Sequence, residues 1–232
     1  MNPLDIIHSS FNPILEYLYQ EPLITLNNKI LPEISFQPAP NDIFKVFRMP
    51  LKDIKVVLLG QDPYSTPGDA VGLSFVNGTD KVPPSLRVIY REILNSTGKE
   101  GDIKSWEQQG VFLLNTSLTV ETGKPLSHSP YWKPFIINVI KYISFHQPCI
   151  WFLWGKAAQS FQIYIYHPFD LSKYNNETIM EVPVTNDYNY IFRAPHPASE
   201  VYSGGSSGFY GCNHFIYSNI VLIKLRKTNI NW

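Results

Sequence analysis

Val56-Val57-Leu58-Leu59-Gly60-Gln61-Asp62-Pro63-Tyr64 is the stretch of the chain that first indicates its fold. Its first four residues are all apolar, which is typical of a strand in a parallel sheet that is covered on both faces. Gly60 and Pro63 then interrupt the apolar pattern, as residues in turns do. The stretch predicts a short buried strand that ends in a loop bearing the carboxylate of Asp62.

Two further runs are continuously apolar in the same way, at Val111–Leu114 and Ile150–Trp154, and a fourth short apolar run is at Tyr190–Phe192. Helix-compatible segments lie between the runs, for example Ser85–Leu94 and Pro134–Ile143. Strands that alternate with helices favour a parallel sheet with helices on both faces. We therefore predict an α/β fold with three α/β/α layers around a short, mostly parallel sheet of four strands.

The rest of the chain has weaker patterns. Residues 1–40 are expected to form an N-terminal extension of helix and loop with a helical stripe at Ile14–Tyr19, and a short helical piece is expected at Ile43–Phe47. The long polar and aromatic stretch Tyr164–Asn189 is predicted to be an insertion, either a surface excursion or a partner-docking segment. Ala198–Gly208 is rich in Ser and Gly and is expected to be a flexible loop.

Length and composition restrict the class of protein. The chain has 232 residues, of which 44% are apolar and 16% are charged, and this fits one folded domain over residues 1–232. No apolar run is as long as a membrane span, and the first residues lack the pattern of a secretory signal. Cys149 and Cys212 are expected to be free thiols. We expect an intracellular monomer, cytoplasmic or nuclear and not secreted.

The formal net charge of the chain is zero. Proteins that bind nucleic acids usually have a basic excess, because much of their affinity comes from contacts to phosphates. Charge alone therefore leaves two alternatives: either the partner is not DNA, or the basic residues gather on one face.

Each of the four runs is followed, within four residues, by a residue that can take part in chemistry. These residues are, in chain order, Asp62, Asn115, Lys156 and His196. Ligands of open α/β sheets bind beyond the carboxyl ends of the strands. Four parallel strands would therefore bring an acid, an amide, a cation and an imidazole to one edge of the sheet.

Plain structural roles compete with functional roles for these residues. Asp62 precedes a proline and would start a turn, Asn115 would cap a strand end, and His196 would be a loop histidine. Alternatively, the carboxylate could orient a water, the amide could read a base edge, and the imidazole could donate to an oxyanion. The aromatic rings of Tyr64 and Phe75 suit either core packing or base stacking.

The order and spacing of these motifs match one family. From about Asn41 to Trp232 the sequence resembles the classical (family 1) uracil-DNA glycosylases, which remove uracil from DNA. The matching stretches are Lys55–Tyr64, Gly72–Phe75, Pro83–Leu86, Trp106–Val120, Leu153–Lys156, Ala194–Pro197 and Gly208–Phe215. Other glycosylase families place an Asn or an Ala in the first motif, where this chain has Gln61-Asp62-Pro63-Tyr64.

The resemblance implies a monofunctional hydrolase without metal or organic cofactor. It would cleave the N-glycosidic bond of a deoxyuridine that is flipped out of single- or double-stranded DNA. Asp62 would position the water and stabilise the oxocarbenium-like sugar, and His196 would donate a hydrogen bond to uracil O2. These two residues would be the catalytic pair.

The resemblance also implies how uracil would be recognised. Asn115 would read the O4 and N3–H edge and reject cytosine, and Phe75 would stack on the base. Tyr64 would exclude thymine by crowding its methyl group. Gln61 would add backbone contacts to the pocket.

Contacts to the DNA backbone are implied as well. Ser85 maps onto the family's proline-rich loop, and Gly155 and Lys156 map onto its glycine loop, where a lysine can reach a phosphate. The complete set of DNA-contacting candidates is Ser85, Gly155, Lys156, Ser199, Val201 and Tyr202.

Two departures from the family pattern bear on activity. Ser65 stands where the family usually has a histidine, and we expect slower but retained turnover. The family's loop after His196 inserts a Leu into the duplex, but the simple count here places Glu200 at that position, and a charged residue is a poor wedge. We favour Tyr202 over Val201 as the wedge.

Two other functions share parts of the pattern. A catalytically weak relative could act as a DNA-binding or processivity partner of replication or repair proteins; Ser65 and the altered loop leave this open, whereas Asp62, Asn115 and His196 argue against it. An α/β hydrolase or a nucleotide-binding module has little support, because the chain has neither a Gly-x-Ser-x-Gly elbow nor a phosphate-binding loop.

Overall fold

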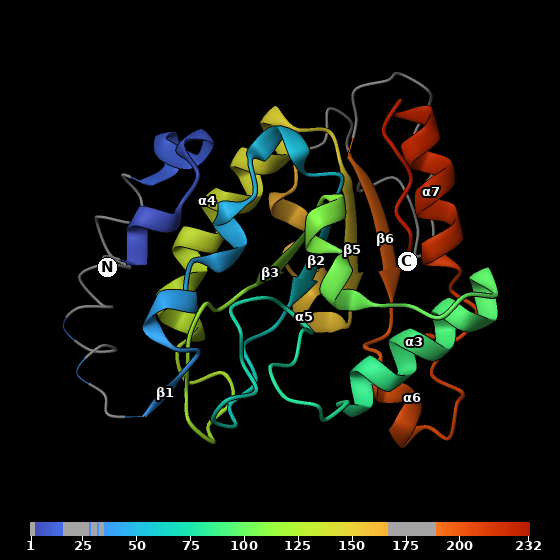
Figure 1. Cartoon of the computed structure of the whole chain (residues 1–232), viewed down its shortest axis with the longest axis horizontal. Helices are drawn as coiled ribbons and strands as arrows, with labels where there is room; N and C mark the ends of the chain where they lie inside the picture. Colours follow the sequence, from blue (N-terminus) through green and yellow to red (C-terminus); the bar gives the residue numbers. More distant parts are fainter. Residues whose placement is uncertain (1–2, 16–27, 29–31, 33–34, 167–188) are drawn as a thin grey trace.

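The computed structural model describes residues 3–15, 28, 32, 35–166 and 189–232 (Figure 1). Its centre is a four-stranded sheet in the order β3-β2-β5-β6. The strands are β2 (Val56–Gly60), β3 (Val111–Asn115), β5 (Ile150–Trp154) and β6 (Tyr190–Ala194). Each neighbouring pair is parallel, so the four apolar runs are confirmed as strands of one parallel sheet.

Helices cover both faces of this sheet, which confirms the predicted three-layer α/β/α fold. They are α3 (Pro84–Thr97), α4 (Ser129–His146), α5 (Lys156–Gln159), α6 (Ala198–Tyr202) and α7 (His214–Lys224). In Figure 1, α4 lies on one side of the sheet, and α3 and α7 lie on the other. Every residue of β2, β3 and β5 is buried, as their continuous apolar sequences predict.

The two longest of these helices contain the predicted helical segments and extend beyond them. Helix α3 includes Ser85–Leu94 and is followed by Gly98, whose φ of 73° is the left-handed conformation that glycine adopts readily after a helix. Helix α4 includes Pro134–Ile143 but begins at Ser129, with a proline in its first turn. A proline is tolerated there because the first N–H groups of a helix have no partner within it.

Short elements connect the layers. Strands β1 (Phe36–Gln37) and β4 (Val120–Glu121) form a separate antiparallel pair. The 3₁₀ helices are η1 (Pro3–Ile6), η2 (Ser9–Phe11), η4 (Pro40–Asp42), η5 (Lys45–Arg48), η6 (Leu51–Asp53), η7 (Ile103–Ser105), η8 (Glu107–Gln109) and η9 (Gln162–Tyr164). The predicted helical piece at Ile43–Phe47 is therefore a turn followed by η5 rather than an α-helix.

The predicted flexible loop at Ala198–Gly208 is wrong in its first half, which forms helix α6. Of the stripe at Ile14–Tyr19, residues 14 and 15 are helical; the rest of it, much of the N-terminal extension and most of Tyr164–Asn189 lie outside the described residues. Cys149 and Cys212 are free, as predicted, and both are buried. Within the described part of the chain, every helix is too short or too polar to cross a membrane.

Candidate active site

A cavity of about 550 Å³ opens at the carboxyl edge of the sheet, where the ligand site was expected. Of the predicted site residues, its lining includes Gln61, Asp62, Tyr64, Phe75, Ser85, Asn115, His196 and Tyr202. Gly155 and Lys156 line a smaller adjoining cavity of about 130 Å³, which shares His196 with the first. Ser199 and Val201 line neither cavity.

The ends of β2 and β3 are tied together beneath this cavity. The Gly60 carbonyl accepts a hydrogen bond from the backbone N–H of Thr116 at 2.9 Å, and the Gln61 carbonyl accepts one from that of Ser117 at 3.0 Å. The Thr116 hydroxyl also donates to the Gln61 carbonyl at 2.6 Å. These bonds fix the loop that bears Asp62 relative to the strand end that bears Asn115.

Asn115 is 6% exposed and lines the cavity wall. Gly60 makes room for it, because a Cβ at this position would lie 2.7 Å from the Cβ of Ser74 and would collide with Oδ1 of Asn115. No other described residue makes a hydrogen bond to the Asn115 side-chain amide. Its donor and its acceptor are therefore available to a ligand in the cavity.

The Asp62 carboxylate is held by donors from two segments. Its Oδ1 accepts a hydrogen bond from Nε2 of Gln61 at 3.0 Å, and its Oδ2 accepts one from the backbone N–H of Leu126 at 2.7 Å. Leu126 has a φ of 69°, in the left-handed region that leucine rarely adopts. Nothing in the sequence pointed to Leu126, because the strained backbone, not the side chain, provides the contact.

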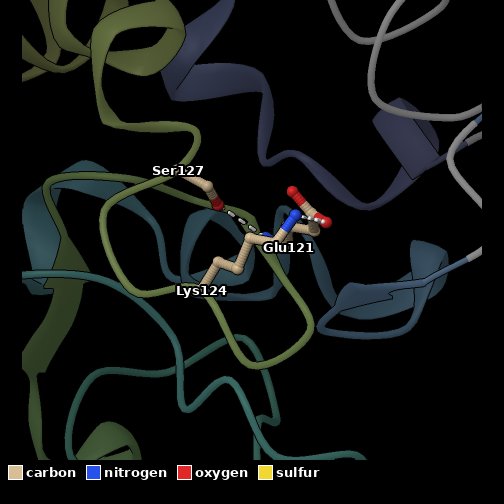
Figure 2. A network of polar contacts seen from close by, with 3 residues as sticks. All are labelled: Glu121, Lys124 and Ser127. Atoms are coloured by element: carbon tan, nitrogen blue, oxygen red, sulfur yellow. Dashed lines mark hydrogen bonds and ion pairs between the residues drawn. The ribbon is translucent and has the colours of Figure 1, made fainter.

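The loop that presents Leu126 is closed by polar contacts, which Figure 2 shows. The Lys124 ammonium lies 2.6 Å from Oε1 of Glu121, and the Glu121 N–H donates to the Ser127 hydroxyl at 2.8 Å. The Gly123 N–H donates to the carbonyl of Ser65 at 3.0 Å. This loop is therefore joined directly to the segment that follows the Asp62 motif.

His196 is held in one tautomer. Its Nδ1 accepts a hydrogen bond from the backbone N–H of Ala198 at 3.2 Å, so the proton of the neutral ring is on Nε2. Burial lowers the pKa of His196 below its ordinary value, which favours the neutral ring. The side chain can therefore donate one hydrogen bond from Nε2 while it remains uncharged.

Gly155 lies directly against His196. This close packing was not predicted from the sequence. Its φ is 87°, and a Cβ at this position would lie 2.8 Å from the Cβ of His196. Its N–H donates to the carbonyl of Ala194 at 2.9 Å. The glycine is required because β5 and the segment after β6 approach closely where the imidazole is placed.

Two aromatic residues complete the cavity. Phe75 has a φ of 62° and stacks on the His196 ring, with centroids 6.0 Å apart and planes 28° from parallel. Its ring also meets that of Trp154 edge-on at 5.8 Å. The Tyr64 hydroxyl donates to the Phe75 carbonyl at 3.2 Å, and burial raises the pKa of Tyr64 to about 12. Both rings are therefore fixed and uncharged.

The candidates for DNA contact surround the mouth of the cavity. Ser85 is in the first turn of α3, and Lys156 is exposed at the start of α5. Tyr202 is 86% exposed and Val201 is 52% exposed. Glu200, by contrast, is 2% exposed, so its side chain does not project from the surface as a wedge would. The described residues contain no group of side chains that could hold a metal ion.

Solved structures identify the class of this fold. The crystal structure of mimivirus uracil-DNA glycosylase matches the chain with a TM-score of 0.79 at 23% sequence identity, over 100% of this chain and 89% of that one. The likeness shows an α/β fold shared with a DNA glycosylase.

Sequence comparisons identify the family. The model of the Uracil DNA glycosylase superfamily matches residues 48–208. A uracil-DNA glycosylase of Campylobacter jejuni subsp. jejuni serotype O:23/36 (strain 81-176) is 37% identical over 213 residues, covering 88% of this chain and 82% of the relative. That of Aliarcobacter butzleri (strain RM4018) is 41% identical over 205 residues, covering 84% and 85% respectively. The chain belongs to the uracil-DNA glycosylase superfamily.

Proposed function

We propose that the cavity hydrolyses the N-glycosidic bond of deoxyuridine in DNA, which releases uracil and leaves an abasic site for base excision repair. The observation that carries the proposal is the convergence of Asp62, Asn115 and His196 on one cavity at the carboxyl edge of the sheet. Family membership and the curated relatives support the same reaction. Assignment to the classical subtype rests on the Gln61-Asp62-Pro63-Tyr64 motif.

In this proposal, Asp62 and His196 act on opposite sides of the bond that breaks. As the bond lengthens, positive charge grows on the sugar and negative charge grows on uracil. The Asp62 carboxylate stabilises the sugar cation and orients the attacking water. The water oxygen bonds to the anomeric carbon as the bond to uracil breaks, and the proton that the water loses passes to Asp62 and then to solvent. The Nε2–H of His196 donates to uracil O2 and stabilises the leaving anion.

Recognition of the base uses the remaining residues of the cavity. The uncommitted amide of Asn115 pairs with one acceptor and one donor on the uracil edge, a pattern that cytosine reverses. The ring of Phe75 stacks on the base. The Gln61 backbone contributes to the pocket wall.

The same proposal includes the DNA backbone. Ser85, Ser199 and Lys156 contact phosphates, and Gly155 lets the backbone approach closely. Tyr202, with Val201 beside it, enters the duplex in place of the flipped nucleotide. We expect a single-domain monomer that acts inside the cell, in the cytoplasm or a nucleus, without a cofactor and alongside replication or repair proteins.

Uracil release from a uracil-containing oligonucleotide in the presence of a metal chelator tests the proposal. We expect release from both single- and double-stranded DNA and none from the matched thymine-containing oligonucleotide. Binding of the oligonucleotide by well-folded protein without any release would instead favour a role as a DNA-binding partner in a replication complex.

Tyr64→Ala is expected to admit thymine. Removal of the ring vacates the space beside C5 of the base, so the preference for uracil over thymine should fall about 100-fold, near the upper limit for discrimination by one methyl group. The measurement is the ratio of uracil to thymine release from matched oligonucleotides. Tyr64→Phe is the control: it loses the hydrogen bond to the Phe75 carbonyl but keeps the ring, and it should still exclude thymine.

Ser65→His is expected to raise turnover roughly three- to tenfold, because an imidazole beside the Asp62 motif can help to hold the water or a nearby phosphate. Ser65 lines the same cavity as Asp62. The measurement is kcat on single-stranded DNA. Unchanged turnover in Ser65→His would show that the serine does not limit the rate.

A further inference from the structure

We propose that Glu200 is a positioning residue for the DNA wedge: its buried carboxylate fastens helix α6 to the segment that follows it, and so holds Tyr202 at the mouth of the cavity before DNA binds. This inference rests on the proposed function, in which Tyr202 enters the duplex.

The carboxylate of Glu200 acts as an anchor because it joins helix α6 to the segment that follows it through several hydrogen bonds. Its Oε1 accepts hydrogen bonds from the backbone N–H groups of Phe209 at 2.5 Å and Tyr210 at 2.9 Å, and its Oε2 accepts one from that of Ser207 at 3.2 Å. Its own carbonyl accepts the N–H of Gly205 at 2.9 Å. Glu200 therefore accepts hydrogen bonds from four backbone N–H groups of the segment that follows α6.

The carboxylate is charged in this environment. Burial acts to raise the pKa of Glu200. The hydrogen bonds from Tyr210, Ser207 and Phe209 have a larger opposite effect, so the pKa is lowered. Hydrogen bonds to a charged acceptor are stronger than neutral ones. A neutral side chain of the same size would therefore hold this segment less firmly.

Helix α6 needs such an anchor because of its sequence. It has five residues, and a helix this short is not stable without tertiary contacts. The segment after it contains Gly204, Gly205 and Gly208, with φ values of 65°, 90° and 92°. These glycines permit the sharp turn but restrict the backbone little. The Glu200 carboxylate closes the turn that the glycines allow.

The anchor and the wedge lie on different sides of α6. Glu200 is 2% exposed, whereas Tyr202, the last residue of the helix, is 86% exposed and lines the active-site cavity. The helix packs against α3, beside which it lies in Figure 1. A ring that is held in place before binding loses less conformational entropy when it enters the duplex.

His196 is also held by residues outside α6. Its ring stacks with Phe75, and its Cβ packs closely against Gly155. Loss of the Glu200 contacts should therefore disturb Tyr202 while the groups that act on the base remain in place. The effect should fall on double-stranded DNA, where a wedge is needed, rather than on single-stranded DNA.

The test measures uracil release from one oligonucleotide sequence in single- and double-stranded form, by the wild type, Glu200→Gln, Tyr202→Ala and the double variant. We expect the ratio of the double- to the single-strand rate to fall about tenfold in Glu200→Gln, as for loss of one charge-assisted hydrogen bond. The double variant should show no further fall than Tyr202→Ala, because both changes act through the same wedge. The two rates in each ratio are measured on the same preparation, so a lower fraction of folded protein reduces both rates equally and leaves the ratio unchanged.

Glu92→Gln is the matched control. Glu92 is the other fully buried carboxylate among the described residues, and it accepts backbone N–H groups from Gly211 at 2.8 Å and Asn213 at 3.0 Å. Its hydrogen bonds hold Gly211 and Asn213, next to the start of α7, and no residue of α6, so its replacement should leave the ratio unchanged. If Glu200→Gln does not fold, Glu200→Asp, which is one methylene shorter, must show the selective loss.

Other outcomes separate the two proposals. Equal losses on both substrates, or an additive loss in the double variant, would overturn the role of Glu200 and leave uracil release intact. A Tyr202→Ala variant without a selective loss would overturn the wedge and the anchor together. Absence of release from either substrate by the wild type would refute the proposed function itself.

Discussion

Asp62→Asn is expected to lower kcat for uracil release by about 10³-fold, within the range that positioned acid–base and electrostatic groups contribute. The amide carries no charge to stabilise the sugar cation. It also cannot accept from both present donors, Gln61 Nε2 and the Leu126 N–H, because one of its two polar atoms is itself a donor. The water and the sugar would then face a neutral and displaced group.

The measurement is the single-turnover rate on single-stranded DNA, together with the affinity for the same oligonucleotide. Affinity should change little, because Asp62 acts on charge that develops only in the transition state. Asp53→Asn is the matched control: Asp53 is exposed in η6, outside the cavity, and its replacement should leave the rate unchanged. A rate for Asp62→Asn close to that of the wild type would remove this residue from the mechanism.

His196→Ala is expected to lower kcat by about 10²- to 10³-fold, the usual loss when one donor to a developing oxyanion is removed. The variant loses the Nε2–H of the imidazole. In the wild type this group is free to donate to the ligand, because Nδ1 accepts the N–H of Ala198. His8→Ala is the matched control, because His8 is bonded to Ser10 beside η2 and does not line the cavity. Equal rates for the two variants would contradict the assignment.

The protonation of His196 gives this prediction a pH dependence. Burial places the pKa of His196 below its ordinary value of 6.5, so the ring stays neutral at pH 6.5 and above. As the pH falls through this lowered pKa, Nδ1 gains a proton and opposes the N–H of Ala198. The folded state then binds protons less readily than the unfolded state, so stability also decreases toward acid. The kcat profile measured above pH 6.5 should show no transition from this residue.

The sheet and much of the cavity could be predicted because the apolar runs indicate buried strands, and the parallel direction of those strands indicates where their ends lie. Val56–Leu59 and Ile150–Trp154 are apolar without interruption, and strands of this kind are covered on both faces. Parallel strands end at the same edge of a sheet, so the sequence alone predicts that Asp62, Asn115 and His196 lie together.

The unpredicted contacts depend on backbone conformation. The N–H of Leu126 reaches Asp62 only because a leucine adopts a left-handed conformation, which its residue type disfavours. Glu200 was judged a poor wedge because of its charge, but its burial in a short helix was not predicted. Gly155 was predicted from the resemblance as a DNA contact, and its approach to His196 needs the register of β5 and β6.

The reactivity of the two buried cysteines reports whether the protein is folded. Burial raises the pKa of Cys149 and of Cys212 to about 12, and only a thiolate reacts rapidly with alkylating or oxidising reagents. One thiol immediately precedes β5 and the other lies just before α7. We therefore expect both thiols to react slowly in the folded protein and rapidly once the chain around β5 and α7 unfolds.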